Sequence, residues 1–212
     1  MIDSTNVKAT ATKGEIEQLC REAIQYGFRC AVVNSFYVKL VAELLKNSNV
    51  KVCSTIGFPL GVSLPEIKSF EAVKAVEDGA EKLDMVINLS ALKSSDYELV
   101  KQDIVAVVNA KRLAKEVIVK VIIETAQLTR DEKVIACKLV SEAGADFVKT
   151  STGLFGGATV EDIKLMRQTV GKNMGVKAAG GIRTYSDAIA MIQAGANRIG
   201  TSAAVAIIKG AP

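Results

Sequence analysis

Short apolar runs alternate with longer amphipathic stretches along the whole chain. The runs have the length of strands, and the stretches between them repeat apolar residues at helical spacing. The predicted strands cover residues 2–6, 29–34, 51–57, 82–88, 117–124, 146–151, 175–181 and 198–202. The predicted helices cover roughly residues 13–26, 36–46, 65–79, 94–114, 129–142, 159–170 and 185–193, with a short one after Ser202. This alternation is typical of a parallel α/β architecture.

Three segments repeat the same joint between a helix and a strand. They are EDGAEKLDMV from Glu77, EAGADFVKTS from Glu142 and QAGANRIGTS from Gln193. In each, a glycine just past the helix supplies the left-handed residue that ends it. The intervals between the joints each leave room for two strand–helix units, so eight units fit into 212 residues. We therefore predict a (β/α)8 TIM barrel, a single α/β domain over residues 1–212. A doubly wound open sheet is the alternative, although no GxGxxG or Walker motif follows an early strand.

The composition restricts the chemistry that this barrel can perform. Hydrophobic residues make up 49% of the chain and charged residues 24%, which is the profile of a globular protein. The chain contains no histidine. Ser-His-Asp and Cys-His machinery, histidine metal sites and imidazole acid–base catalysis are therefore excluded. Any catalysis must use Lys, Asp, Glu, Cys, Ser, Thr or Tyr.

The distribution of charge and cysteine indicates the partners and the compartment. The net charge of +4 is scattered, and Lys111-Arg112 is the longest basic stretch, so a nucleic-acid partner is not expected. A modest positive surplus suits a phosphate ester. The four cysteines lack CxxC spacing and lie in apolar patterns, which predicts buried thiols in a reducing compartment: Cys20, Cys30, Cys53 and Cys137. Without a signal-peptide pattern or a run of membrane length, we expect a cytoplasmic protein with no membrane partner.

Alternation along the strands places polar side chains inside the predicted barrel. In the strand at 117–124 the apolar residues Val119, Val121 and Ile123 suit the helix layer. Lys120, Ile122 and Glu124 must therefore face inward. The same reasoning places further polar residues in the lumen: Asp3 and Thr5, Asn34, Asp84, Lys149 and Lys177. Because a barrel interior is normally packed with apolar residues, these positions need an explanation.

Three inward lysines on neighbouring strands favour chemistry over a purely structural role. A buried ion network without catalysis is the alternative. Crowding three ammonium groups at low dielectric costs free energy, which is relieved when one lysine loses its proton. A neutral lysine attacks carbonyl groups, so the pattern predicts Schiff-base chemistry with Asp84 as proton shuttle. The residue pattern does not decide between Lys149 and Lys177 as the nucleophile.

Glycine-rich loops follow the last three predicted strands. They are Thr150 to Gly153, Gly180-Gly181, and Gly200 to Ser202, the last at the start of a short helix. Glycine lets a backbone approach an anion, and barrels often hold phosphate in their last loops. Turns need glycine in any case, but three successive loops of this kind favour a phosphate site.

Five segments together resemble the deoxyribose-phosphate aldolase family: KLDMVIN, VKVIIET, VKTSTG, VKAAGGIRTYSDA and RIGTS. The resemblance runs from Ile2 to about Ile208. It implies a class I aldolase on a (β/α)8 barrel that reversibly joins acetaldehyde and glyceraldehyde 3-phosphate. It also implies that the partners are a phosphorylated sugar and aldehydes, and that no metal or cofactor takes part apart from a covalent imine. We further expect a homo-oligomer.

The resemblance assigns roles that the residue pattern leaves open. It makes Lys149 the Schiff-base lysine, Lys177 the neighbour that depresses its pKa, and Asp84 the acid/base. It implies that five residues bind phosphate or substrate: Thr152, Gly153, Gly180, Gly181 and Ser202. Asp3 and Thr5 match a DxT pattern, and Lys120 matches an inward lysine.

The chain also departs from the family pattern. Ser4 stands where many members have histidine, the loop at 154–157 is shorter, and Ala203 replaces a serine. The chain ends at Pro212 without the Tyr-ended tail of some members. These departures are expected to affect phosphate affinity and turnover but not the type of reaction. A transaldolase-like enzyme and a non-catalytic sugar-phosphate-binding barrel are the alternative functions.

Overall fold

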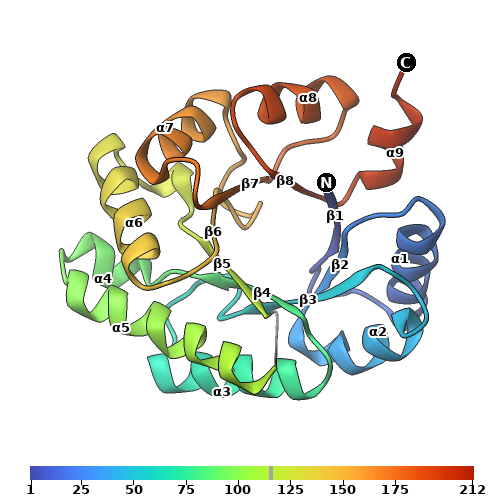
Figure 1. Cartoon of the computed structure of the whole chain (residues 1–212), viewed down its shortest axis with the longest axis horizontal. Helices are drawn as coiled ribbons and strands as arrows, with labels where there is room; N and C mark the ends of the chain where they lie inside the picture. Colours follow the sequence, from blue (N-terminus) through green and yellow to red (C-terminus); the bar gives the residue numbers. More distant parts are fainter. Residues whose placement is uncertain (115–116) are drawn as a thin grey trace.

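Eight parallel strands form a closed barrel in the computed structural model, which describes residues 1–114 and 117–212 (Figure 1). The strands are β1 (Ile2–Asn6), β2 (Cys30–Val33), β3 (Lys51–Ile56), β4 (Lys82–Val86), β5 (Ile118–Ile122), β6 (Phe147–Lys149), β7 (Gly175–Ala179) and β8 (Arg198–Thr201). Each strand pairs with its neighbours in sequence, and β8 pairs with β1 to close the barrel. The predicted (β/α)8 fold is therefore confirmed.

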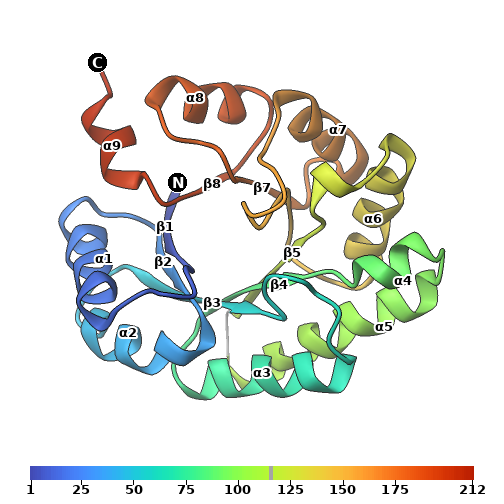
Figure 2. The ribbon, with the colours of Figure 1, turned by 180° about the vertical axis from the view of Figure 1, so that it is seen from behind.

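Helices surround the barrel on its outside (Figures 1 and 2). They are α1 (Lys13–Gln25), α2 (Val38–Leu45), α3 (Pro65–Glu77), α4 (Leu89–Lys93), α5 (Tyr97–Val108), α6 (Arg130–Glu142), α7 (Val160–Val170), α8 (Tyr185–Gln193) and α9 (Ala204–Lys209), with 3-10 turns η1 (Ser35–Tyr37), η2 (Asn109–Leu113) and η3 (Thr125–Gln127). Capping boxes at Thr12, Thr129 and Thr184 fix the starts of α1, α6 and α8. Among the described residues, no helix is long and apolar enough to cross a membrane.

The predicted joints end their helices as expected. The glycines Gly79, Gly144 and Gly195 have φ angles of 106°, 78° and 118°. Each lies two residues after the last residue of its helix, α3, α6 or α8. These positive angles cost glycine little, whereas other residues adopt them rarely. The chain can therefore reverse direction and begin the next strand within a few residues.

Several predicted segments are shorter or divided in the structure. At 94–114 and 117–124, capping side chains or a left-handed residue interrupt the regular geometry. The helix predicted at 94–114 is α5 followed by the 3-10 turn η2, and the short helix α4 precedes it. Asn88 and Asp96 accept backbone hydrogen bonds at the starts of α4 and α5, and Ser95 between them has a φ of 59°. The strand predicted at 117–124 ends at Ile122, and Glu124 has a left-handed φ of 55°.

The barrel separates an apolar layer from a polar lumen. Outward residues of the strands pack against the helices in the main core, among them Leu83, Met85, Val119, Val121 and Ile123. Inside the barrel the apolar cluster is small and consists of Cys30, Val32 and Cys53 with Val7 packed against it. The predicted assignment of these strand faces is confirmed, and so is the burial of the cysteines, which are all free.

Candidate active site

Two carboxylates and three lysines meet inside the barrel. Asp84 on β4 lies between three ammonium groups, because its Oδ1 is 2.8 Å from Lys120 Nζ and its Oδ2 is 2.8 Å from Lys149 Nζ. Lys177 Nζ lies 2.8 Å from the same Oδ2 and 2.7 Å from Asp3 Oδ2. The strand register explains this convergence, because Asp84 lies opposite Lys120 and Lys149 lies opposite Lys177. The structure thus brings together five of the charged residues that the sequence placed in the lumen, and Glu124 lies outside this cluster.

The five groups have different pKa values because they share the counter-charges unequally. Burial and the ammonium group of Lys177 lower the pKa of Lys149, although Asp84 opposes them. Burial acts in the same direction on Lys177 and Lys120, but there the nearby carboxylates prevail and raise the pKa. Burial would raise the pKa of Asp84, but the three lysines together hold it well below its ordinary value. Three lysines face two carboxylates, so one ammonium charge is not balanced. Lys149 is the lysine whose lowered pKa lets it lose its proton most readily.

Lys149 is also the lumen lysine that reaches a cavity. A cavity of about 610 Å³ opens above the lumen, and Lys149 lies in its wall. Six other predicted site residues line the same cavity: Thr5, Thr152, Gly153, Gly180, Gly181 and Ser202. The other predicted lumen residues do not line this cavity: Asp3, Asn34, Asp84, Lys120 and Lys177. Lys149 is therefore the lysine that combines a lowered pKa with access to a substrate-sized space.

The loops after β6 and β7 form one side of the cavity. Gly153, Gly180 and Gly181 have φ angles of 92°, 87° and 76°. A Cβ atom on Gly180 would lie 3.0 Å from the Gly156 carbonyl oxygen, so only glycine allows these loops to approach so closely. The N–H of Ala158 donates to the Gly180 carbonyl over 3.0 Å and ties the two loops together.

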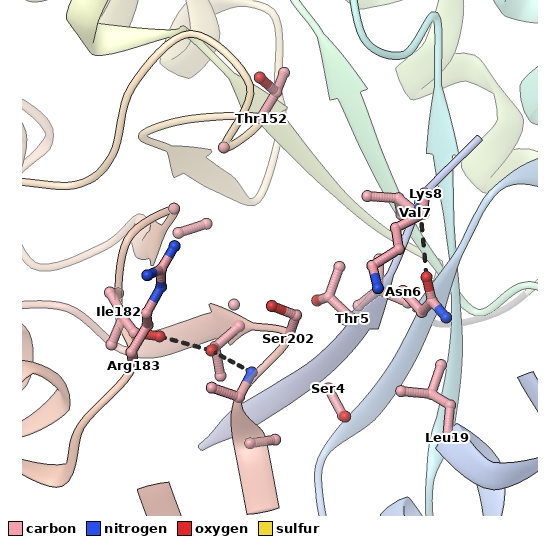
Figure 3. Close-up of a pocket in the computed structure, with 18 of the residues that line it drawn as sticks. Ser4, Thr5, Asn6, Val7, Lys8, Leu19, Thr152, Ile182, Arg183 and Ser202 are labelled. Carbon is pink, nitrogen blue, oxygen red and sulfur yellow. Dashed lines mark hydrogen bonds between the residues drawn. The ribbon is translucent and has the colours of Figure 1, made fainter. Parts of the chain in front are cut away.

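The loop after β8 forms the adjoining side, as Figure 3 shows. The Thr201 hydroxyl donates to the Ile182 carbonyl over 2.7 Å and accepts from the N–H of Ala203 over 2.9 Å. These bonds place Ser202 beside the loop after β7. Arg183, which sequence reasoning did not select, also lines the cavity, where it directly follows the Gly-Gly-Ile segment.

Two further residues contact the predicted site, although the sequence assigned no role there to either of them. The Cys53 thiol donates to Asp84 Oδ1 over 3.2 Å, and burial together with Asp84 raises the pKa of Cys53 above its ordinary value. Glu124 is fully buried after β5 and accepts hydrogen bonds from the backbone N–H and the hydroxyl of Thr152. The alternation pattern had placed Glu124 inward, but nothing in the sequence gave it a partner.

The remaining predicted lumen residues are held by local hydrogen bonds. The Thr5 hydroxyl donates to the Asp3 carbonyl over 3.0 Å. The Thr55 hydroxyl donates to Asn34 Oδ1 over 3.1 Å, which places Asn34 in the wall formed by β2 and β3. This hydrogen bond does not connect Asn34 to the lysine cluster. Within residues 1–114 and 117–212 no group of three or more His, Cys, Asp or Glu residues is arranged to hold a metal.

Known proteins resemble this chain over nearly its whole length. Residues 2–210 match the family described as DeoC/LacD family aldolase. The deoxyribose-phosphate aldolase of Thermococcus kodakarensis is 62% identical over 216 residues, which cover 100% of this chain and 95% of the relative. That of Methanothermobacter thermautotrophicus is 59% identical over 212 residues, covering 99% and 93%. A solved tetrameric deoxyribose phosphate aldolase from Aeropyrum pernix superposes with a TM-score of 0.91 at 39% identity, covering 98% of this chain and 88% of the other.

Proposed function

Because the chain belongs to the DeoC/LacD family of aldolases, we propose that it reversibly cleaves 2-deoxy-D-ribose 5-phosphate through an imine on Lys149. The products are acetaldehyde and D-glyceraldehyde 3-phosphate. One observation supports Lys149 above all others: it is the lumen lysine with a lowered pKa that also lines the cavity. Lys177 is held between two carboxylates and has a raised pKa.

The proposed reaction begins with the neutral amine of Lys149. It attacks the C1 aldehyde of the open-chain sugar, and loss of water gives a protonated imine. The C3 hydroxyl then loses its proton to Asp84, the C2–C3 bond breaks, and its electron pair moves into the imine to give an enamine. Glyceraldehyde 3-phosphate leaves, the enamine is protonated at C2, and water releases acetaldehyde and Lys149. The protonated imine accepts the electron pair, so the sequence of steps requires no metal or cofactor.

The phosphate group is expected at the loop end of the cavity. Gly153, Gly180, Gly181 and Ser202 line that end, and Arg183 adds a cation there. Glycines leave the backbone accessible to an anion, and a guanidinium group suits phosphate. The substrate would then extend from the phosphate loops to Lys149, with its C1 aldehyde at the amine.

We also propose that the chain functions as a cytoplasmic homo-oligomer with residues 1–212 as one barrel domain. Four buried free thiols suit a reducing compartment. The relative from Aeropyrum pernix is described as a tetramer. On this chain, exposed apolar residues lie on α3 and beside it, where a second copy would cover them.

Borohydride trapping tests the proposed nucleophile. Incubation with acetaldehyde and borohydride should reduce the imine and leave one stable adduct on Lys149, which peptide mapping locates. Lys149→Leu should abolish both the adduct and the turnover at every pH. An adduct centred on Lys177, or spread over surface lysines, would refute the assignment. Absence of both adduct and acetaldehyde release would favour a non-catalytic sugar-phosphate-binding barrel.

A further inference from the structure

Glu124 is a buried carboxylate that the proposed reaction does not use. Its side chain is fully buried, and its backbone has a φ of 55°, which is uncommon for a residue other than glycine. The angle interrupts the β5–β6 ladder, because the N–H of Ile123 donates to the Lys149 carbonyl and that of Thr125 donates to the Thr150 carbonyl. The acceptors, Lys149 and Thr150, are adjacent in sequence, whereas the donors, Ile123 and Thr125, are two residues apart. The chain after β5 therefore has one extra residue opposite the chain after β6, which is a β-bulge. Such bulges redirect side chains near active sites.

The redirected carboxylate takes both hydrogen-bond donors of Thr152. Glu124 Oε2 accepts from the Thr152 N–H over 3.1 Å and from the Thr152 hydroxyl over 2.5 Å. The Thr152 hydroxyl also accepts from the N–H of Leu154 over 3.2 Å. In Figure 3 the Thr152 side chain points away from Arg183 and Ser202. Thr152 thus offers the cavity no donor of its own.

Gly153 lies between Thr152 and Leu154, whose backbone N–H groups already donate hydrogen bonds within the loop. The N–H groups on both sides of it are bonded, and its own N–H makes no hydrogen bond within the described residues. It lines the cavity and packs against Gly180, because a Cβ atom built on Gly153 would lie 3.7 Å from Gly180 Cα. The same loop also approaches η3 closely near Glu124, because a Cβ atom built on Gly156 would lie only 2.5 Å from Ala126 Cβ.

We propose that Glu124 is a positioning residue for the phosphate end of the site. By accepting both donors of Thr152, it fixes the turn that holds Gly153, with its free N–H, against the loop after β7. Thr152 then acts through Glu124 and is not itself a phosphate ligand. The inference rests on the proposed aldolase function and adds a residue to it.

A comparison of two substrates tests this role. The phosphate preference is the ratio of kcat/KM for 2-deoxyribose 5-phosphate to that for 2-deoxyribose. Glu124→Gly suits the left-handed backbone, so it should fold while it removes the carboxylate. It should lower the phosphate preference about tenfold through a higher KM for the phosphorylated sugar. A loss of about this size is expected when one hydrogen bond to an anion is misplaced. Glu124→Gln retains an acceptor oxygen and should stay within about threefold of the wild type.

A double-mutant cycle tests whether Glu124 and Thr152 act as one unit. Thr152→Val should lower the phosphate preference as much as Glu124→Gly does, and the double variant should lower it no further. Asp131→Asn removes an exposed carboxylate from the first turn of α6 and is the matched control, with no expected change. All variants should give the acetaldehyde adduct on Lys149.

Three results would overturn the proposal. Falls that multiply in the double variant would mean independent roles. A fall in Thr152→Val without one in Glu124→Gly would make Thr152 a direct phosphate ligand. Equal losses on both substrates would make Glu124 merely structural. Failure of the aldolase function itself would appear differently, as no adduct and no acetaldehyde release in the wild-type protein.

Discussion

At the scale of single residues, the unequal sharing of two carboxylates among three lysines determines the reactivity of the site. Lys177 pairs with both Asp3 and Asp84, whereas Lys149 pairs with Asp84 alone among the described carboxylates. A lysine with two carboxylate partners keeps its proton, and its charge then disfavours a second proton nearby. Lys177 would therefore promote the reaction through its charge, without bonding to the substrate.

Removal of Lys177 is expected to shift the acid limb of the pH–rate profile. The charge of Lys177 lowers the pKa of Lys149, and Lys177 also competes for Asp84 Oδ2. Without it the pKa of Lys149 rises toward its ordinary value of about 10.4. Because the neutral amine is the reactive form, Lys177→Leu should lose activity near neutrality and partly regain it at alkaline pH. The measurement is kcat/KM against pH.

The same substitution leaves the Asp3 carboxylate buried without its lysine, which destabilises the fold. Lys177→Leu combined with Asp3→Asn removes both charges and serves as the control for folding. If the acid limb of the folded double variant stays at the wild-type pH, Lys177 does not act through its charge.

Asp84→Asn is expected to separate imine formation from proton transfer. The change removes the carboxylate that opposes the low pKa of Lys149, so a neutral amine remains available. Borohydride trapping with acetaldehyde should therefore survive, while turnover falls by roughly 10²- to 10⁴-fold, the usual contribution of a positioned acid or base. If Asp84 is only a counter-ion, the variant should instead melt at a lower temperature and keep its turnover per folded molecule.

At the scale of helices and strands, a buried ion pair joins α3, α5 and β4. Lys68 Nζ donates to Asp103 Oδ2 over 2.6 Å and to the Val86 carbonyl over 2.9 Å, and both side chains are fully buried. Val86 lies two residues after Asp84 on β4, so the pair supports the strand that carries the site.

Breaking this pair should destabilise the protein more than replacing it. Asp103→Ala leaves an ammonium group buried without its counter-charge and should cost about 3–5 kcal/mol of unfolding free energy. Lys68→Met combined with Asp103→Leu should cost much less, because neither residue is then charged. Denaturant unfolding of both variants and of Lys68→Met provides the comparison. Additive losses in the double variant would show that the two charges do not depend on each other.

The sequence predicts the elements better than it predicts their contacts. Period-two alternation identified Asp84, Lys120, Lys149 and Lys177 as inward residues, because the side-chain period of a strand is local information. The choice between the lysines depends on which carboxylate each one meets across strands that are far apart in sequence. The bulge at Glu124 escaped prediction for a related reason, since its partner Thr152 lies 28 residues away.

At the scale of the whole molecule, a group of exposed apolar residues lies on α3 and beside it. Leu64, Ile67 and Phe70 are three residues apart at the start of α3 and are 67%, 57% and 71% exposed. Phe36 is 85% exposed, and its neighbour Ser35 donates to Glu71, which brings η1 beside this stripe. Leu60 and Val62, just before α3, are also exposed. We call these six residues the α3 patch.

The α3 patch is expected to be the contact between copies of this chain. Exposed apolar patches of this kind are uncommon on monomers, and a two-fold axis lets one patch cover its own copy. Phe70→Glu would bury a charge without a partner at such a contact, so it should lower the molar mass measured by size-exclusion chromatography with light scattering to that of a smaller assembly. Ile24→Glu on α1 changes a residue that is 47% exposed outside the patch, and it should keep the wild-type mass. A wild-type protein that elutes as a monomer, or a Phe70→Glu variant of unchanged mass, would assign the contact to another surface or to none.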